Sequence, residues 1–200
     1  MNLLLTIPWA ATDWSERGRL TADTALPINQ SGHDLARQWR ESIGDAPLSV
    51  VYVSKEVTGT QTAEAIVDSS RTRIKPVAGL EEISVGLWEG LSADVLRTRF
   101  GKVYKRWTDD PMSVCPPEGE PLEDAQDRLM GTVGKLVRKS EERRALVLGP
   151  MACGVVRCSL ESIPLQRTWE MTTRGPIWYN LTCDNDTVAG RRLDTVAARG

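Results

Sequence analysis

The sequence predicts an α/β fold: a three-layer αβα sandwich around a mostly parallel central sheet. Two observations predict it. Short apolar runs recur along the chain, and segments whose apolar residues repeat at helical spacing lie between them. Helices that connect parallel strands cover both faces of a sheet, so we expect a functional site at the edge where strands end and loops begin.

Five apolar runs are the expected strands. The runs at 3–7 and 48–53 are the clearest, and the second is rich in β-branched residues. The run at 145–148 stops at Gly149 and Pro150, where a strand must give way to a turn. Weaker strands are expected at 74–77 and 178–182.

Helical spacing of apolar residues appears around 35–43, 63–67 and 129–137, and a further helix is expected after Gly149. The stretch 85–117 is different, since it holds Trp88, Trp107 and three prolines. We expect it to be a helical excursion that covers the loop edge of the sheet. With no repeat and no long linker, residues 1–200 are expected to form a single domain.

Composition excludes several classes of function. One histidine among 200 residues cannot supply a His-rich metal site or a pair of imidazoles. The 25 Lys and Arg nearly balance the 27 Asp and Glu, which indicates neither nucleic acid nor an anionic membrane as partner. Four scattered cysteines fit a reduced, cytoplasmic protein better than a zinc site or a disulfide scaffold. We expect no metal and no cofactor.

Residues 7–36, IPWAATDWSERGRLTADTALPINQSGHDLA, resemble the opening of the histidine phosphatase superfamily, the phosphoglycerate mutase-like enzymes. Several positions match that opening without a gap: Thr12, Trp14, Gly18, Arg19, Leu26, Pro27, Asn29 and Gly32. Four later segments also resemble the family: QTA at 61–63, LEEISVGLWEGL at 80–91, PPEGEPLED at 116–124 and VLGPMACGVVRCSLESIP at 147–164. The resemblance fades after about Trp169 and implies a phosphoglycerate mutase-like fold.

The departures from that family fall on its chemistry. Where the family has Arg-His-Gly-Glu, this chain has Pro8, Trp9, Ala10 and Ala11, and it has Ser15 at the position of the family's Asn. The resemblance places Thr58 at the phosphate-binding arginine and Gly149 at the second histidine. Only the acid is kept, at Glu82. The former phosphate pocket is therefore predicted at Pro8, Trp9, Thr12, Ser15, Arg19, Thr58, Glu82 and Gly149.

These replacements remove what phosphoryl transfer through a covalent intermediate requires: a nucleophile, a positive clamp and an acid for the leaving group. An indole has no nucleophilic lone pair and one N–H donor, so Trp9 replaces neither a histidine nor a guanidinium. Without the arginines and histidines of the family, the charge of the pocket changes from positive to negative, and an ionised Glu82 repels phosphate. We expect no catalytic residues of the family mechanism in this chain.

Several residues have both a functional and a structural interpretation. Trp9 either plugs the old cavity or stacks on a ligand ring. Arg19 and Lys55 either bind an anion or form surface ion pairs. Cys153 and Cys158 are read as buried structural cysteines, although a helix N-terminus lowers the pKa of a nearby thiol. His33 is expected to be an exposed first-turn residue.

Three functional hypotheses follow. In the first, the chain is a pseudoenzyme that binds a protein partner, a ligand or its own copy. In the second, it is an enzyme with a rebuilt site around Glu82 that acts on a weakly charged substrate. In the third, it is an active phosphatase or mutase that takes a catalytic residue from another chain.

Overall fold

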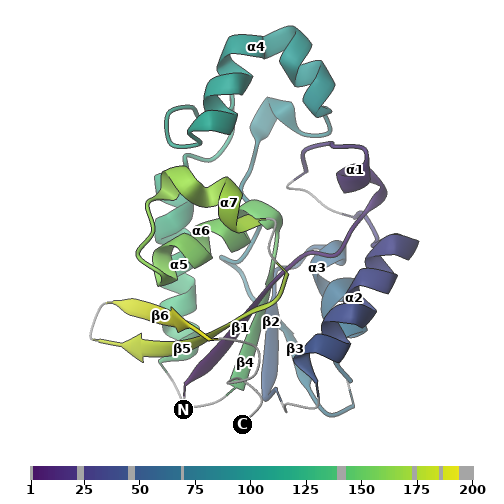
Figure 1. The fold of residues 1–200 in the computed structure, drawn as a ribbon, viewed down its shortest axis with the longest axis vertical. Coiled ribbons are helices and arrows are strands. Elements are labelled where there is room, and N and C mark those ends of the chain that lie inside the picture. Colours follow the sequence, from purple (N-terminus) through teal and green to yellow (C-terminus); the bar gives the residue numbers. More distant parts are fainter. Residues whose placement is uncertain are drawn as a thin grey trace.

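The computed structural model describes residues 2–21, 25–44, 48–68, 70–138, 143–172, 175–184 and 187–193. Its six strands form one mixed sheet in the order β3-β2-β4-β1-β5-β6 (Figure 1). The strands are β1 (Leu3–Pro8), β2 (Val50–Val53), β3 (Arg73–Pro76), β4 (Arg143–Leu148), β5 (Ile177–Cys183) and β6 (Val188–Arg192). The predicted α/β fold with a mostly parallel sheet is confirmed.

The centre of the sheet is parallel and buried. Strand β4 lies between β1 and β2, in parallel with both, and pairs Val147 with Ile7 and with Val53. All six residues of β1 are buried, as are five of the six in β4. A parallel strand covered on both faces reads as a continuous apolar run, which explains why these strands stand out in the sequence.

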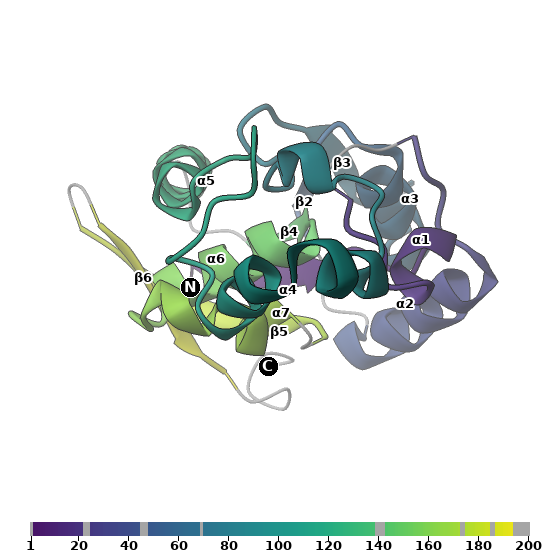
Figure 2. The same cartoon turned by 90° about the horizontal axis from the view of Figure 1, so that it is seen from above.

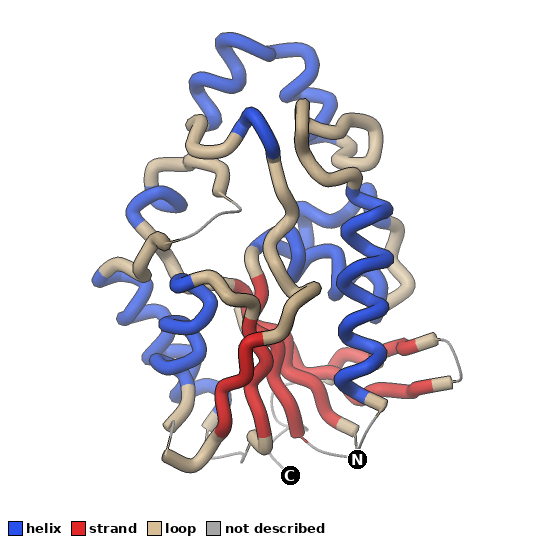
Figure 3. The backbone as a smooth tube through the Cα atoms, turned by 180° about the vertical axis from the view of Figure 1, so that it is seen from behind, coloured by secondary structure: helices blue, strands red, loops and turns tan. Residues whose placement is uncertain are grey.

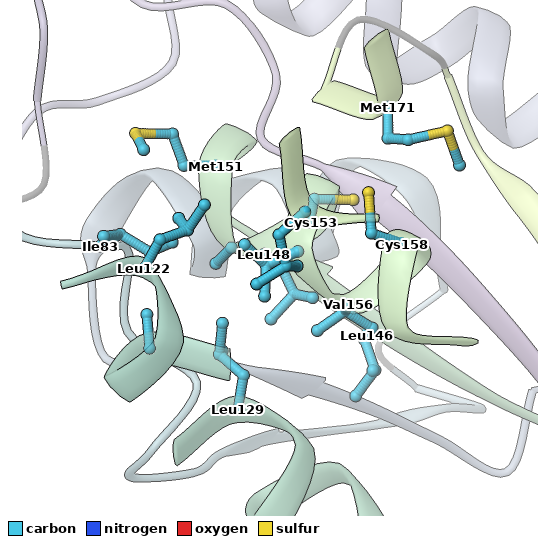
Figure 4. Packing of buried hydrophobic residues seen from close by; sticks show 14 of the residues in the cluster. Ile83, Leu122, Leu129, Leu146, Leu148, Met151, Cys153, Val156, Cys158 and Met171 are labelled. Atoms are coloured by element: carbon cyan, nitrogen blue, oxygen red, sulfur yellow. The ribbon is translucent and has the colours of Figure 1, made fainter. Parts of the chain in front are cut away.

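Helices cover both faces of the sheet. On one face lie α2 (Gln30–Ile43) and α3 (Val57–Ile66), whose apolar side chains share a core with β1 and β2. On the other lie α5 (Leu122–Val137), α6 (Pro150–Leu160), a 3-10 turn η2 (Leu165–Arg167) and α7 (Thr168–Thr172). Figure 4 shows the second core, where Leu129 of α5 faces Leu146 and Leu148 of β4.

The excursion between β3 and α5 holds a 3-10 turn, η1 (Gly86–Trp88), and the helix α4 (Ala93–Asp109). Figures 1 and 2 show α4 beyond the carboxyl ends of the parallel strands. Trp88 is buried among Phe100, Tyr104 and Trp107, with ring centroids 5.4 to 6.0 Å apart. Trp169 of α7 donates from Nε1 to the carbonyl oxygen of Trp107 at 3.1 Å. These contacts hold the excursion in place over the loop edge of the sheet.

Element boundaries differ from the prediction in several places. The helix predicted around 35–43 begins at Gln30, because Asn29 caps it by accepting from the Gly32 N–H at 2.9 Å. Strand β6 was not predicted, and it pairs with β5 as an antiparallel hairpin at the sheet edge (Figure 3). Strand β4 begins at Arg143, two residues before the predicted run at 145–148, and its Arg144 is 1% exposed. Asn2 accepts a hydrogen bond from Arg144 Nη1 at 2.8 Å.

Candidate functional site

The carboxyl ends of β1, β2 and β4 meet at one edge of the sheet, because these strands are parallel neighbours. Trp9 follows β1, Ser54 follows β2 and Gly149 follows β4. The Trp9 N–H donates to the Leu148 carbonyl oxygen at 2.9 Å, which joins the first and last of these loops. Residues far apart in sequence are thereby brought to one place.

Glu82 lies in this edge and is 5% exposed. Its carboxylate accepts hydrogen bonds from the backbone N–H groups of Met151 (2.9 Å to Oε2), Ala152 (2.8 Å to Oε1) and Ile83 (2.7 Å to Oε1). Met151 and Ala152 are in the first turn of α6, where N–H groups have no partner inside the helix. Glu82 therefore caps α6 from a distant part of the chain.

Gly149 is the N-cap residue of α6 and has no side chain to cap it. A Cβ placed on Gly149 would overlap Oε2 of Glu82 and lie 2.5 Å from its Cδ and 2.7 Å from its Cβ. The Glu82 carboxylate thus occupies the space that a side chain at 149 needs. With this packing, a residue larger than glycine fits at 149 only if Glu82 moves away.

Burial raises the pKa of Glu82 to about 7. The three N–H donors favour the charged form and oppose this rise, while the nearby carboxylate of Glu56 adds to it. Desolvation is the largest of these effects, so the Glu82 carboxyl titrates near neutral pH.

Trp9 fills the space beside α3 and is 8% exposed. A Cβ placed on Gly59 would lie 2.9 Å from Trp9 Nε1 and 3.6 Å from its Cδ1, so the indole packs directly on the first turn of α3. The indole therefore plugs this part of the edge. The N–H of the next residue, Ala10, is bonded to Thr62 Oγ1 at 3.0 Å.

The other predicted pocket residues are divided between the interior and the surface. Thr58 is buried and donates from Oγ1 to the Leu26 carbonyl oxygen at 2.6 Å. Thr12 caps the one-turn helix α1 (Asp13–Glu16): its Oγ1 accepts from the Ser15 N–H at 3.1 Å, and Ser15 Oγ accepts from the Thr12 N–H at 2.9 Å. Pro8 is the buried last residue of β1. Each of these side chains therefore has a structural role.

The candidate cations lie on the surface. Arg19 is exposed, donates to the Gly90 carbonyl oxygen at 2.8 Å and lies 5.9 Å from the centroid of a Trp14 ring. Lys55 is also exposed. His33 is exposed on α2, as predicted. Cys153 is fully buried, and burial raises the pKa of its thiol, so the helix terminus does not make it a thiolate.

Two residues at this edge, Ser54 and Glu56, were not predicted from the sequence. Glu56 is the N-cap residue of α3 but makes no capping hydrogen bond with its side chain. Its Oε1 accepts from the Glu82 N–H at 3.4 Å. The sequence signal for Glu56 is a carboxylate three residues after the end of the buried strand β2.

The described part of the chain contains no group of three or more His, Cys, Asp or Glu residues arranged to hold a metal ion. Among those residues there is also no helix long and apolar enough to cross a membrane.

The family model of the histidine phosphatase superfamily (branch 1) matches residues 10–194, nearly the whole chain. The chain belongs to this superfamily. The match extends past Trp169 and through the β5–β6 hairpin, farther than the motifs reach.

Relatives with curated names are phosphatases and mutases of this superfamily. Phosphoserine phosphatase 1 of Hydrogenobacter thermophilus is 21% identical over 172 residues, covering 84% of this chain and 81% of the relative. An uncharacterized phosphatase, PhoE, of Bacillus subtilis is 26% identical over 148 residues, covering 74% and 71%.

Solved structures of low sequence identity share the fold. Bacillus stearothermophilus YhfR superposes with a TM-score of 0.83 at 20% identity, covering 97% of this chain and 98% of that one. The mycobacterial glucosyl-3-phosphoglycerate phosphatase complexed with VO3 has a TM-score of 0.81 at 17% identity, covering 96% and 97%. The phosphoglycerate mutase-like architecture is confirmed.

Proposed function

We propose that this chain is a catalytically inactive member of the histidine phosphatase superfamily that acts by binding, to a protein partner or to a second copy of itself. The observation that carries the proposal is the position of Glu82. Its carboxylate fills the space of a side chain at 149 and caps α6, so the acid kept from the family motif serves the fold.

The loop after β1 supports the same conclusion. A buried indole packs on α3 at the position where the family resemblance places the nucleophile, and Thr58 donates its hydroxyl hydrogen to a backbone carbonyl. Neither side chain supplies a nucleophile or a positive clamp for phosphate. Loss of the nucleophile alone costs a hydrolase about a million-fold in rate.

The competing hypothesis is an enzyme rebuilt around Glu82. A carboxyl with a pKa near 7 suits general acid–base work. However, both Glu82 oxygens accept hydrogen bonds from backbone N–H groups and the residue is buried, so its carboxyl is turned toward α6. This geometry favours the binding function.

An activity assay tests the proposal. Purified wild-type protein is incubated with p-nitrophenyl phosphate and with 3-phosphoglycerate, beside an active histidine phosphatase as positive control. We expect no turnover above buffer. The Glu82→Gln variant, which keeps the shape of the side chain, is assayed in parallel. Turnover by the wild type that disappears in this variant would overturn the proposal.

The binding half of the proposal is tested separately by sedimentation velocity over a hundred-fold range of concentration. A concentration-dependent dimer identifies the second copy as the partner. A strictly monomeric protein leaves a different protein as partner, to be identified by crosslinking in the source cells.

We also propose the cytoplasm as its compartment. The four cysteines are all free thiols, as expected where glutathione and thioredoxin keep thiols reduced.

A further inference from the structure

The excursion that carries η1 and α4 holds most of the exposed apolar side chains. Among the described residues four large apolar side chains are exposed, and three of them lie here: Leu87 at 61%, Phe100 at 38% and Val103 at 47%. Single exposed apolar residues are ordinary on a protein surface, so it is their concentration in one segment that indicates an interaction surface.

Helix α4 is the basic part of an acidic chain. It carries five cations against two acids, a net charge of +3, while the whole chain has a net charge of −2, so the remainder carries −5. All five cations are exposed: Arg97, Arg99, Lys102, Lys105 and Arg106. Two of them pair with the acids of the same helix, Asp94 and Asp109. The other three form no ion pair within the described part of the chain, which leaves their charge for an external partner.

The second half of α4 directs its cations away from the body of the protein. Tyr104 and Trp107 are buried in the aromatic cluster. Lys102, Lys105 and Arg106 are spaced i, i+3 and i+4, so they share the opposite, exposed face of the helix. Figure 1 shows α4 as the outermost element at one end of the long axis. The cluster therefore presents these charges on a fixed support at the tip of the molecule.

This position suits a planar anionic surface. A plane can meet α4 end-on while the acidic remainder of the chain lies on the other side of the helix, and salt screens charges that are more than about 8 Å from the surface. A stable protein interface buries about 800 Å² of matching surface on each partner. Figure 2 shows α4 as a single kinked helix that crosses the tip, a convex ridge that a membrane accepts without a complementary shape.

We propose that α4 is a docking surface for a membrane that contains anionic lipids. Its exposed cations bind the headgroups, while Val103 and the exposed edge of Phe100 contact the boundary between headgroups and acyl chains. The cytoplasmic leaflet carries such lipids, which agrees with the proposed compartment. The surface lies outside the former phosphate pocket and goes beyond the proposed function. It revises the expectation of no membrane partner, which was based on the net charge of the whole chain and not on its distribution.

Co-sedimentation with lipid vesicles tests this surface. The full-length protein is mixed with vesicles of phosphatidylcholine alone or with vesicles in which one third of the lipid is phosphatidylserine, over a range of salt concentrations. We expect binding to the phosphatidylserine vesicles alone. We also expect this binding to weaken as salt rises, because salt screens exposed charges.

Matched variants connect the binding to α4. Each unit of charge near an anionic membrane changes the affinity roughly five-fold, so the double reversal Lys102→Glu/Arg106→Glu should weaken binding by about two to three orders of magnitude. The control is Arg73→Glu/Lys75→Glu on the exposed edge strand β3, which changes the net charge equally and should alter binding less than about two-fold. Val103→Ala removes apolar contact and should weaken binding about three-fold.

Three results would overturn the assignment of α4 to a membrane: equal binding to both kinds of vesicle, no binding to either, or equal losses in the two double reversals. Binding of polyglutamate without binding to phosphatidylserine vesicles also overturns it, and assigns α4 to an acidic protein instead. None of these results concerns the former phosphate pocket. Hydrolysis of p-nitrophenyl phosphate that is lost in Glu82→Gln overturns the proposed function and leaves the α4 surface standing.

Discussion

Helices α3 and α6 begin at the same edge of the sheet, yet their N-termini are stabilised differently. The first turn of α6 donates two N–H groups to the Glu82 carboxylate, and Gly149 leaves room for it. The first turn of α3 has no side-chain cap, and the polar atoms beside it lack partners. One half of this edge is part of the packed scaffold, whereas the other half holds buried polar atoms without hydrogen-bond partners.

This difference separates two structural roles for the polar side chains at this edge of the sheet. Where a retained carboxylate finds backbone donors, it becomes structural, and removing it should cost stability. Where the retained polar atoms have no partners, removing them should cost little. The four predictions below test this difference, from the largest effect to the smallest.

Replacing Glu82 by Ala should destabilise the protein by about 3 kcal/mol at pH 5–6, because it leaves buried N–H groups of α6 and Ile83 without an acceptor. Urea denaturation measures the loss. Glu64→Ala, on the exposed side of α3, is the control and should change stability by less than about 0.5 kcal/mol. Equal effects from the two variants would mean that Glu82 does not cap α6.

Stability should also depend on pH through Glu82. Burial raises its pKa in the folded protein to about 7 from the usual 4.5, so the folded state binds this proton more tightly. The contribution is fully present below about pH 4.5 and is lost as pH rises through about 7, a fall on the order of 3 kcal/mol.

Urea denaturation at intervals from pH 4.5 to 8 checks this dependence. The Glu82→Gln variant cannot titrate at this position, so its curve should be flatter than that of the wild type over the same interval. Parallel curves would show that another group causes the dependence.

A side chain at 149 should displace Glu82. Gly149→Ala is expected to cost about 2 kcal/mol through overlap with the carboxylate. In the Glu82→Ala background the same substitution should cost nearly nothing, and Gly149→Ser should restore part of the stability by capping α6 directly. A double-mutant cycle measures the coupling, and strict additivity would disprove the contact.

The smallest effect is expected at the N-terminus of α3. Ser54 Oγ is buried without a partner, so Ser54→Ala should change stability by less than about 0.5 kcal/mol. The matched control is Thr62→Val on the same edge, where the hydroxyl both accepts from Ala10 and donates to Thr58. Its loss should exceed 1 kcal/mol, or about the net value of one buried hydrogen bond.

The sequence predicts the parts of the fold that depend on local patterns. Buried parallel strands such as β1 and β4 are continuous apolar runs, and the fold class follows from them. The β5–β6 hairpin is harder to predict, because the short edge strand β6 carries Gly190 and two exposed arginines. The burial of Arg144 is not predictable from local patterns, because its hydrogen bond to Asn2 joins residues 142 positions apart.

The candidate site was predicted in position but not in its contacts. The motif positions predict that Trp9, Thr58 and Glu82 lie at one edge of the sheet. The capping of α6 by Glu82 depends on the space above Gly149, which no single motif encodes. Glu56 is not predictable for the same reason, because the burial of its Oε2 atom depends on neighbouring loops and not on a local pattern.

The contact between Glu82 and Gly149 restricts how this chain can evolve. A single substitution that adds a side chain at 149 meets the carboxylate, and a single substitution that removes the carboxylate uncaps α6. Any path that introduces a histidine at 149 and removes the Glu82 carboxylate therefore passes through a less stable intermediate, whichever change comes first. Each residue of this pair constrains the other, so selection for folding is by itself sufficient to preserve the carboxylate of Glu82.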